Sequence, residues 1–135
     1  MKLTANFKLE EFLESKFYDR LQQFEVLKSY EKNKSVLFPA IKNLAIQLQV
    51  LRDYLKIPIV INIAYRPEWY ELSRGRSGTS RHCLGIAADI STSLPTSKVR
   101  EAIEQLIKEG KMDQGGIGKY STFVHYDTRG VKARW

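Results

Sequence analysis

Residues 80–90, Ser-Arg-His-Cys-Leu-Gly-Ile-Ala-Ala-Asp-Ile, decide how this chain folds around its most reactive side chains. The apolar and small residues at 86–90 predict a short strand that follows a long loop. Because side chains alternate along a strand, Asp89 lies on the face opposite to that of its apolar neighbours. The stretch therefore predicts a strand whose carboxylate points away from the core, toward the loop that carries His82.

A second strand is predicted at 122–127, where alternation puts His125 and Asp127 on one face. The chain has only two histidines, and one sheet could bring His82, Asp89 and His125 together. Two neutral imidazoles and a carboxylate, with a fourth position open to water, match the ligand set of catalytic zinc. Such a metal lowers the pKa of its bound water to about 7 and polarises a carbonyl oxygen. Amide hydrolysis is the reaction that such a site would support.

Simpler interpretations of the same residues stay open at this point. A lone histidine is more often a surface or core residue than a metal ligand. Asp89 follows small residues and could begin a turn, and the glycines at 115–118 could form an ordinary hairpin connection.

The rest of the chain alternates between helical and extended patterns. Apolar residues at three- and four-residue spacing predict a helix from Pro39 to Leu55 and another between Pro95 and Gly110. Residues 1–30 show a broken helical pattern, residues 57–64 predict a strand, and residues 66–84 predict a long loop. This order predicts an α+β fold, with a small, mainly antiparallel sheet packed against helices on one side.

Length and composition indicate one soluble domain over residues 1–135. Hydrophobic residues make up 43% of the chain and charged residues 27%, and no repeat or linker interrupts it. Cys83 is the only cysteine, which excludes an intramolecular disulfide and a cysteine-rich metal cluster. Residues 1–14 are acidic where a signal peptide is apolar, and no 18-residue apolar run exists, so we expect neither a signal peptide nor membrane insertion.

The net charge of +7 predicts attraction to polyanions. Lysines and arginines are spread along the chain, and no helix carries a basic stripe interleaved with aromatic residues. We therefore expect no nucleic-acid partner. The open alternative, a basic DNA-binding domain, predicts binding with a steep salt dependence that does not involve His82.

Two segments together resemble the M15 family of zinc D-Ala-D-Ala-type peptidases. The first is Ser-x-His-x-x-Gly-x-Ala-x-Asp at 80–89, and the second is Gly-x-Gly-x-Tyr-x-x-Phe-x-His-x-Asp-x-Arg at 116–129. Tyr-Arg-Pro at 65–67 and the Ala-Arg-Trp ending within 131–135 are also similar to family segments. The resemblance covers about residues 35–135 and implies a hedgehog/D-Ala-D-Ala peptidase-like fold.

The resemblance implies that His82, Asp89 and His125 bind Zn²⁺. It also implies that Arg66 lies near the metal, where it stabilises an oxyanion or holds a substrate carboxylate. A structural ion pair is the alternative role for Arg66.

Two further residues are assigned to substrate binding through the same resemblance. Ser80 is similar to a family serine that contacts substrate beside the first ligand, although it could simply cap the loop. Tyr120 is expected to shape the wall of the cleft.

One position departs from the family pattern. Well-studied members carry Glu or Asp three residues before the last histidine as general base, whereas this chain has Thr122. Asp127 lies on the same strand face as His125, about 7 Å along the strand. We expect Asp127 to be catalytic as the general base, with orientation of a ligand as its alternative role. Glu68 or Glu71 could replace it in the base role.

These observations predict a monomeric zinc metallopeptidase that hydrolyses peptidoglycan stem peptides, as a D-Ala-D-Ala carboxypeptidase or an endolysin-type enzyme. Its partner is then a peptidoglycan peptide. Without a signal peptide, we expect synthesis in the cytoplasm and phage-type release to the cell wall. The alternative is a non-catalytic module of the same fold that binds cell-wall peptides, and the threonine at position 122 supports it.

Overall fold

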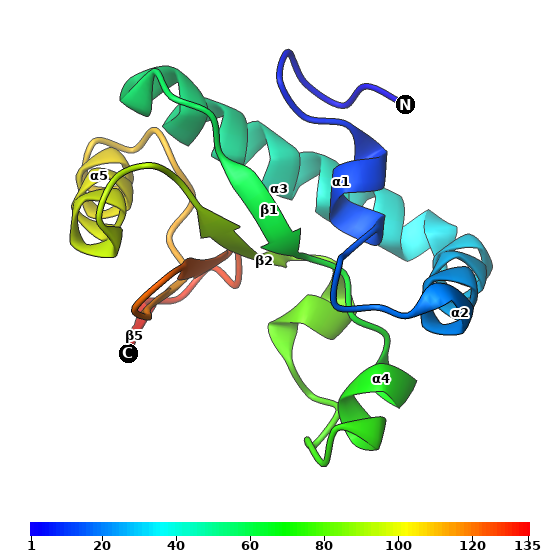
Figure 1. The fold of residues 1–135 in the computed structure, drawn as a ribbon. Helices are drawn as coiled ribbons and strands as arrows, with labels where there is room; N and C mark the ends of the chain where they lie inside the picture. Colours follow the sequence, from blue (N-terminus) through cyan, green and yellow to red (C-terminus); the bar gives the residue numbers. More distant parts are fainter.

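The computed structural model describes all residues from 1 to 135 (Figure 1). Five α-helices, one 3₁₀ helix and five strands follow one another in the order α1 Leu9–Leu13, α2 Arg20–Lys32, α3 Lys34–Leu55, β1 Val60–Ile63, α4 Glu68–Ser73, η1 Arg81–Leu84, β2 Ala87–Ser91, α5 Thr96–Lys108, β3 Gly116–Lys119, β4 Val124–Asp127 and β5 Ala133–Arg134. None of the helices combines the length and the apolar character that a membrane crossing needs.

The strands form one sheet in the order β1-β2-β4-β3-β5. All neighbouring pairs are antiparallel except β3 and β5, which run parallel. The predicted α+β class with a small, mainly antiparallel sheet is thus confirmed. In the β2–β4 ladder, Asp89 pairs directly with His125, which places both residues on the same face of the sheet.

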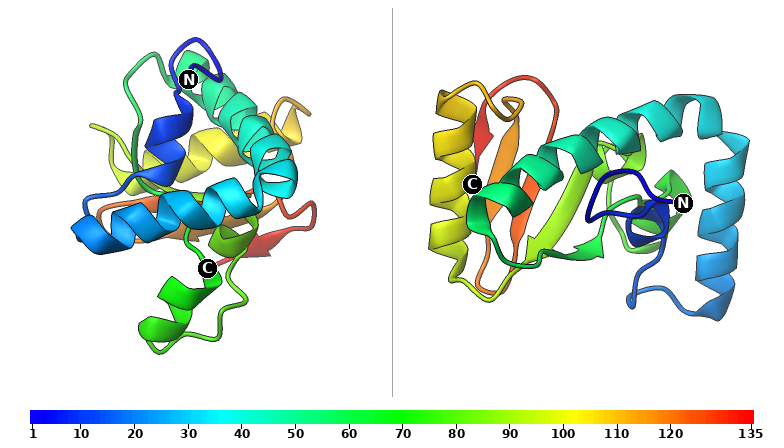
Figure 2. Two further views of the ribbon diagram at one scale, coloured as in Figure 1. Left: turned by 90° about the vertical axis from the view of Figure 1, so that its right-hand side faces the viewer. Right: turned by 90° about the horizontal axis from the view of Figure 1, so that it is seen from above.

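The helices α3 and α5 cover the other face of the sheet (Figure 2). Ile90, Val124 and Tyr126 from the central strands point into a core shared with these helices and are almost fully buried. The predicted alternation along both strands is therefore correct. Burial of one face leaves Asp89 and His125 on the face that the helices do not cover.

The helix predicted from Pro39 begins five residues earlier, at Lys34, and Pro39 lies inside it. Proline removes one backbone donor and normally ends a helix. Here Leu37 and Ile41 are buried on either side of Pro39, so packing against the core outweighs the lost hydrogen bond. Asn33 ends α2 and begins α3, and the two helices meet at a steep angle (Figure 2).

Several short elements were not predicted. The expected loop at 66–84 contains α4, which projects from the body of the molecule (Figure 1), and η1. The glycine-rich stretch is not a hairpin connection but part of β3. A Cβ at Gly116 would lie 2.4 Å from Asp127 Oδ2, and one at Gly118 would lie 2.4 Å from Trp135 Nε1, so close packing explains both glycines.

Candidate metal centre

Three elements bring His82, Asp89 and His125 together over the sheet face that the helices do not cover. His82 lies on η1, Asp89 in β2 and His125 in β4. Gly85 ends η1 in the left-handed conformation, with φ of 73°, and turns the chain into β2. This turn sets the separation between His82 and Asp89, and only glycine adopts it without strain.

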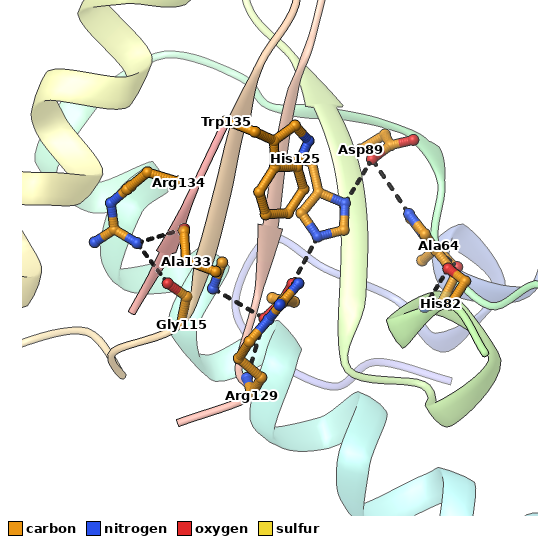
Figure 3. Close-up of polar contacts among 12 residues, drawn as sticks. Ala64, His82, Asp89, Gly115, His125, Arg129, Ala133, Arg134 and Trp135 are labelled. Carbon is orange, nitrogen blue, oxygen red and sulfur yellow. Dashed lines mark hydrogen bonds and ion pairs between the residues drawn. The ribbon is translucent and has the colours of Figure 1, made fainter. Parts of the chain in front are cut away.

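The three side chains face one another (Figure 3). Asp89 Oδ1 lies 3.3 Å from His82 Nε2 and 3.2 Å from His125 Nδ1. One ligand atom from each residue lies within 4.8 Å of the other two. Ligands bound about 2.0–2.2 Å from a tetrahedral ion lie roughly 3.3–3.5 Å from each other, so the spacing fits a single ion. The structure thus brings together all three residues that the sequence predicted as metal ligands.

The backbone fixes the tautomer of His82. The imidazole is buried, and its Nδ1 lies 2.7 Å from the carbonyl oxygen of Ala64. Nδ1 therefore donates a hydrogen bond to the carbonyl oxygen of Ala64, and the lone pair of Nε2 points toward Asp89. Burial lowers the pKa of His82, because the charged form loses its hydration, although the hydrogen bond with Asp89 opposes this effect. A neutral imidazole is the form that a metal ion requires.

A carboxylate fixes the tautomer of His125 in the same way. His125 Nε2 lies 2.7 Å from Asp127 Oδ2 and donates to it, which leaves the lone pair of Nδ1 pointing toward Asp89. Burial alone would lower the pKa of His125, but the carboxylates of Asp127 and Asp89 outweigh it and raise the pKa. Two imidazoles, each held by a hydrogen bond at its other ring nitrogen, and one carboxylate match the ligand requirements of zinc.

Asp89 supplies the negative charge of the cluster. Burial would raise the pKa of its carboxyl, but hydrogen bonds and charge from His125 and His82, when these imidazoles are protonated in the metal-free protein, outweigh burial and hold the pKa well below its usual range. Asp89 is therefore ionised at neutral pH and available as an anionic ligand.

Asp127 is fully buried, and both of its oxygens are occupied. Arg129 donates from Nε to Oδ1 at 2.9 Å and from its terminal nitrogen to Oδ2 at 2.8 Å, and the backbone of Gly116 also donates to Oδ1. The hydrogen bond from His125, together with these bonds, outweighs the effect of burial and holds the pKa of Asp127 well below its usual range. Asp127 contacts Nε2 of the His125 ring, whereas Asp89 faces Nδ1. Of the two predicted roles, this placement favours orientation of His125 over general-base catalysis.

Arg66 reaches the same site from the end of β1. Its side chain is mostly buried, with a terminal nitrogen 3.2 Å from Glu71 and 3.4 Å from the hydroxyl of Ser80. It also lines a pocket of about 490 Å³ that opens over His82, Asp89 and His125. Arg66 thus makes the predicted ion pair and still faces the space in which a substrate would lie.

The two predicted substrate-binding residues also line this pocket. Ser80 Oγ accepts a hydrogen bond from the backbone of His82 at 3.2 Å, so Ser80 caps η1 as well. Tyr120 is half exposed, stacks on Phe123 with ring centroids 4.4 Å apart, and accepts a hydrogen bond from Trp135. These aromatic rings form one wall of the pocket.

Apart from the candidate ligand Asp89, no carboxylate lines the pocket. Thr122 is exposed in the turn before β4, where its carbonyl accepts a hydrogen bond from Ser91. Asp89 is the only acidic residue among those that line the pocket. Of the alternative bases, Glu71 is fully buried in ion pairs and Glu68 does not line the pocket.

Sequence reasoning assigned no role to three arginines of the pocket, Arg76, Arg81 and Arg129. The Asp-x-Arg spacing at the end of β4 was the available signal for Arg129, since residues two apart on a strand share a face. Arg76 and Arg81 lie in irregular segments whose side-chain directions no periodicity gives.

Comparison with known proteins shows to which family the chain belongs. No curated protein matches it. The model of one protein family, described as Peptidase M15, matches residues 19–127 and so spans all three candidate ligands and four of the five strands. With this match over most of its length, and with the three side chains of the metal centre inside it, the chain belongs to the peptidase M15 family.

Proposed function

We propose that this protein is a zinc peptidase that hydrolyses peptide bonds in peptidoglycan stem peptides. The observation that carries the proposal is the convergence of His82, Asp89 and His125. A hydrogen bond at one nitrogen of each imidazole leaves the other nitrogen facing the same point. Zinc bound by this set supplies a Lewis acid and a nucleophilic water near neutral pH. Membership of a peptidase family supports the same reaction.

The protein's own residues bind and orient the reactants. Arg66 offers a guanidinium toward the pocket, where it can hold the developing oxyanion or a substrate carboxylate. The Asp127 carboxylate holds the His125 ring in the orientation that a ligand needs. Ser80 holds Arg66 and η1 in place, and Tyr120 forms the wall against which the peptide lies.

The choice of peptidoglycan rests on the resemblance to D-Ala-D-Ala-type peptidases, and the charge of the protein fits this choice. The cell wall and its attached polymers are anionic, and the net charge of +7 would concentrate the protein there. Added salt should weaken this attraction.

A second candidate function is a binding module for cell-wall peptides that does not turn them over. One observation favours it: Asp89, which is itself a candidate ligand, is the only acidic residue that lines the pocket. Such a module would keep the metal centre but lack a general base.

Digestion of purified muropeptides by the zinc-loaded protein distinguishes the two candidates. The peptidase is supported if wild type releases new products and His125→Ala does not. If wild type binds zinc and muropeptides but releases no product, the enzyme proposal is wrong and the binding module replaces it.

A further inference from the structure

A buried carboxylate holds two arginines beside the metal centre. Glu71, on α4, is fully buried. Its Oε2 accepts a hydrogen bond from a terminal nitrogen of Arg76 at 2.7 Å, and its Oε1 lies 3.2 Å from Arg66. One carboxylate faces two guanidinium groups, so one positive charge of the cluster is left without a partner.

Glu71 is ionised despite its burial. Burial alone would raise its pKa, but the hydrogen bond from Arg76 and the charges of Arg66 and Arg76 outweigh it and lower the pKa. Buried ion pairs contribute little net stability compared with apolar packing, because desolvation offsets their attraction. Positioning the two guanidinium groups is therefore a better account of Glu71 than stability.

Both arginines lie where two pockets meet. The pocket of about 490 Å³ above the metal centre and a neighbouring pocket of about 200 Å³ share Arg66, Arg76 and Asp89 among their lining residues. A peptide that passes the metal centre from one pocket into the other must therefore run beside these guanidinium groups.

Hydrogen-bond donors of both arginines remain free. The side chain of Arg76 is 47% exposed and uses a single terminal nitrogen toward Glu71, which leaves its other terminal nitrogen and Nε for a ligand. Arg66 Nε is buried without a partner. Arg81 also lines the larger pocket and has no ion pair with any carboxylate. Since Asp89 is the only acidic residue lining either pocket, the charge that faces the peptide is positive.

We infer that Arg76, positioned by Glu71, is a specificity-determining residue of this cleft and binds a free carboxylate of the substrate peptide. The inference rests on the proposed function, because it names a specificity-determining residue for that reaction. A guanidinium fork matches the two oxygens of a carboxylate, whereas a carboxamide offers one acceptor and no charge. A peptide lacking the carboxylate would leave partly buried donors without an acceptor.

The test uses a synthetic stem pentapeptide and a series in which each carboxylate is replaced by a carboxamide, one at a time. Binding to the zinc-loaded protein is measured by calorimetry, and product release by mass spectrometry. For wild type, we expect one amidated peptide to bind roughly 10- to 100-fold more weakly, as for loss of hydrogen bonds to a charged group. Arg76→Gln should show the same loss on the parent peptide and no further loss on that amidated peptide.

Two more variants control for folding and for net charge. Arg76→Lys keeps the charge beside Glu71 but loses the fork, and it should show an intermediate loss even if Arg76→Gln folds poorly. Arg20→Gln removes one positive charge from the exposed start of α2, outside the pockets, and should bind the parent peptide as wild type does.

The outcomes separate this inference from the proposed function. If wild type binds every amidated peptide as tightly as the parent, the inference is overturned, whether or not product forms. If binding depends on the carboxylate and on Arg76 but no product is released, the peptidase proposal fails and the carboxylate site stands.

Discussion

Asp89 and His125 lie directly opposite each other in adjacent antiparallel strands, with Asp89 Oδ1 3.2 Å from His125 Nδ1. The register of the sheet therefore places the backbone positions of two of the three candidate ligands side by side, whatever rotamers their side chains adopt. A slip of one residue would send one of them into the core. The sheet thus positions two of the three candidate ligands, whereas His82 comes from η1.

This pairing predicts how His125 titrates in the metal-free protein. Because the Asp89 carboxylate contributes to the raised pKa of His125, Asp89→Asn should lower that pKa. NMR titration of the imidazole protons measures the change. An unaltered His125 pKa in Asp89→Asn would show that the two side chains do not interact in solution.

Asp127→Asn tests whether this residue orients His125 or acts as general base. Asparagine keeps the shape but removes the charge that holds the proton on Nε2, so zinc affinity should fall about 10- to 100-fold. Chelator competition measures the affinity, and peptide hydrolysis is assayed at saturating zinc. Full zinc affinity together with abolished hydrolysis would instead support the base role.

Gly85→Ala should destabilise the protein more than Gly110→Ala. Both glycines have φ near +74°, so alanine pays a left-handed backbone cost of about 1 kcal/mol at either position. Only at Gly85 would the new Cβ approach other side chains, 3.1 Å from Leu37 and 3.3 Å from Ile41, which adds roughly 1–3 kcal/mol. Urea unfolding of both variants gives the difference directly, and equal losses would mean that the turn before β2 is loosely packed.

Glu71→Gln should lower the free energy of unfolding by about 1–3 kcal/mol at neutral pH, because Arg66 and Arg76 lose their shared counter-ion. The Glu71 pKa is lowered from its ordinary value of 4.5 in the folded state. Its contribution is therefore complete above pH 4.5 and is lost as the pH falls through the folded-state pKa.

The stability gap between wild type and Glu71→Gln should accordingly close on acidification. Urea unfolding at a series of pH values from 7 to 3 measures the gap. A gap that stays constant over this range would show that the Glu71 charge does not contribute to stability.

The helices and central strands were predictable because their side-chain periodicity reflects one buried face. The helix ending at Leu55 and the strand carrying Asp89 both follow this rule. The strand β3 was not predictable, since glycine has no side chain to show a period. Its glycines are required by the close approach of Asp127 and Trp135, which lie outside the strand itself.

The candidate ligands were predictable from motif spacing, but their surroundings were not. No local pattern indicates that the carbonyl of Ala64 accepts a hydrogen bond from His82, or that the Glu71 side chain is buried between two arginines. The contact of His82 with Ala64 joins residues 18 positions apart, and periodicity cannot give the direction of the Glu71 side chain in a six-residue helix. The structure was likewise needed to show that Arg129 donates to both oxygens of Asp127, which is the basis for proposing an orienting role.

Zinc content of the purified protein tests the central claim most directly. After dialysis against limiting zinc, mass spectrometry of the metal should find one equivalent per chain in wild type and in the surface control Arg20→Gln, and far less in His82→Ala and His125→Ala. Absence of zinc from wild type, or an undiminished equivalent in both histidine variants, would contradict the metal centre and with it the proposed reaction.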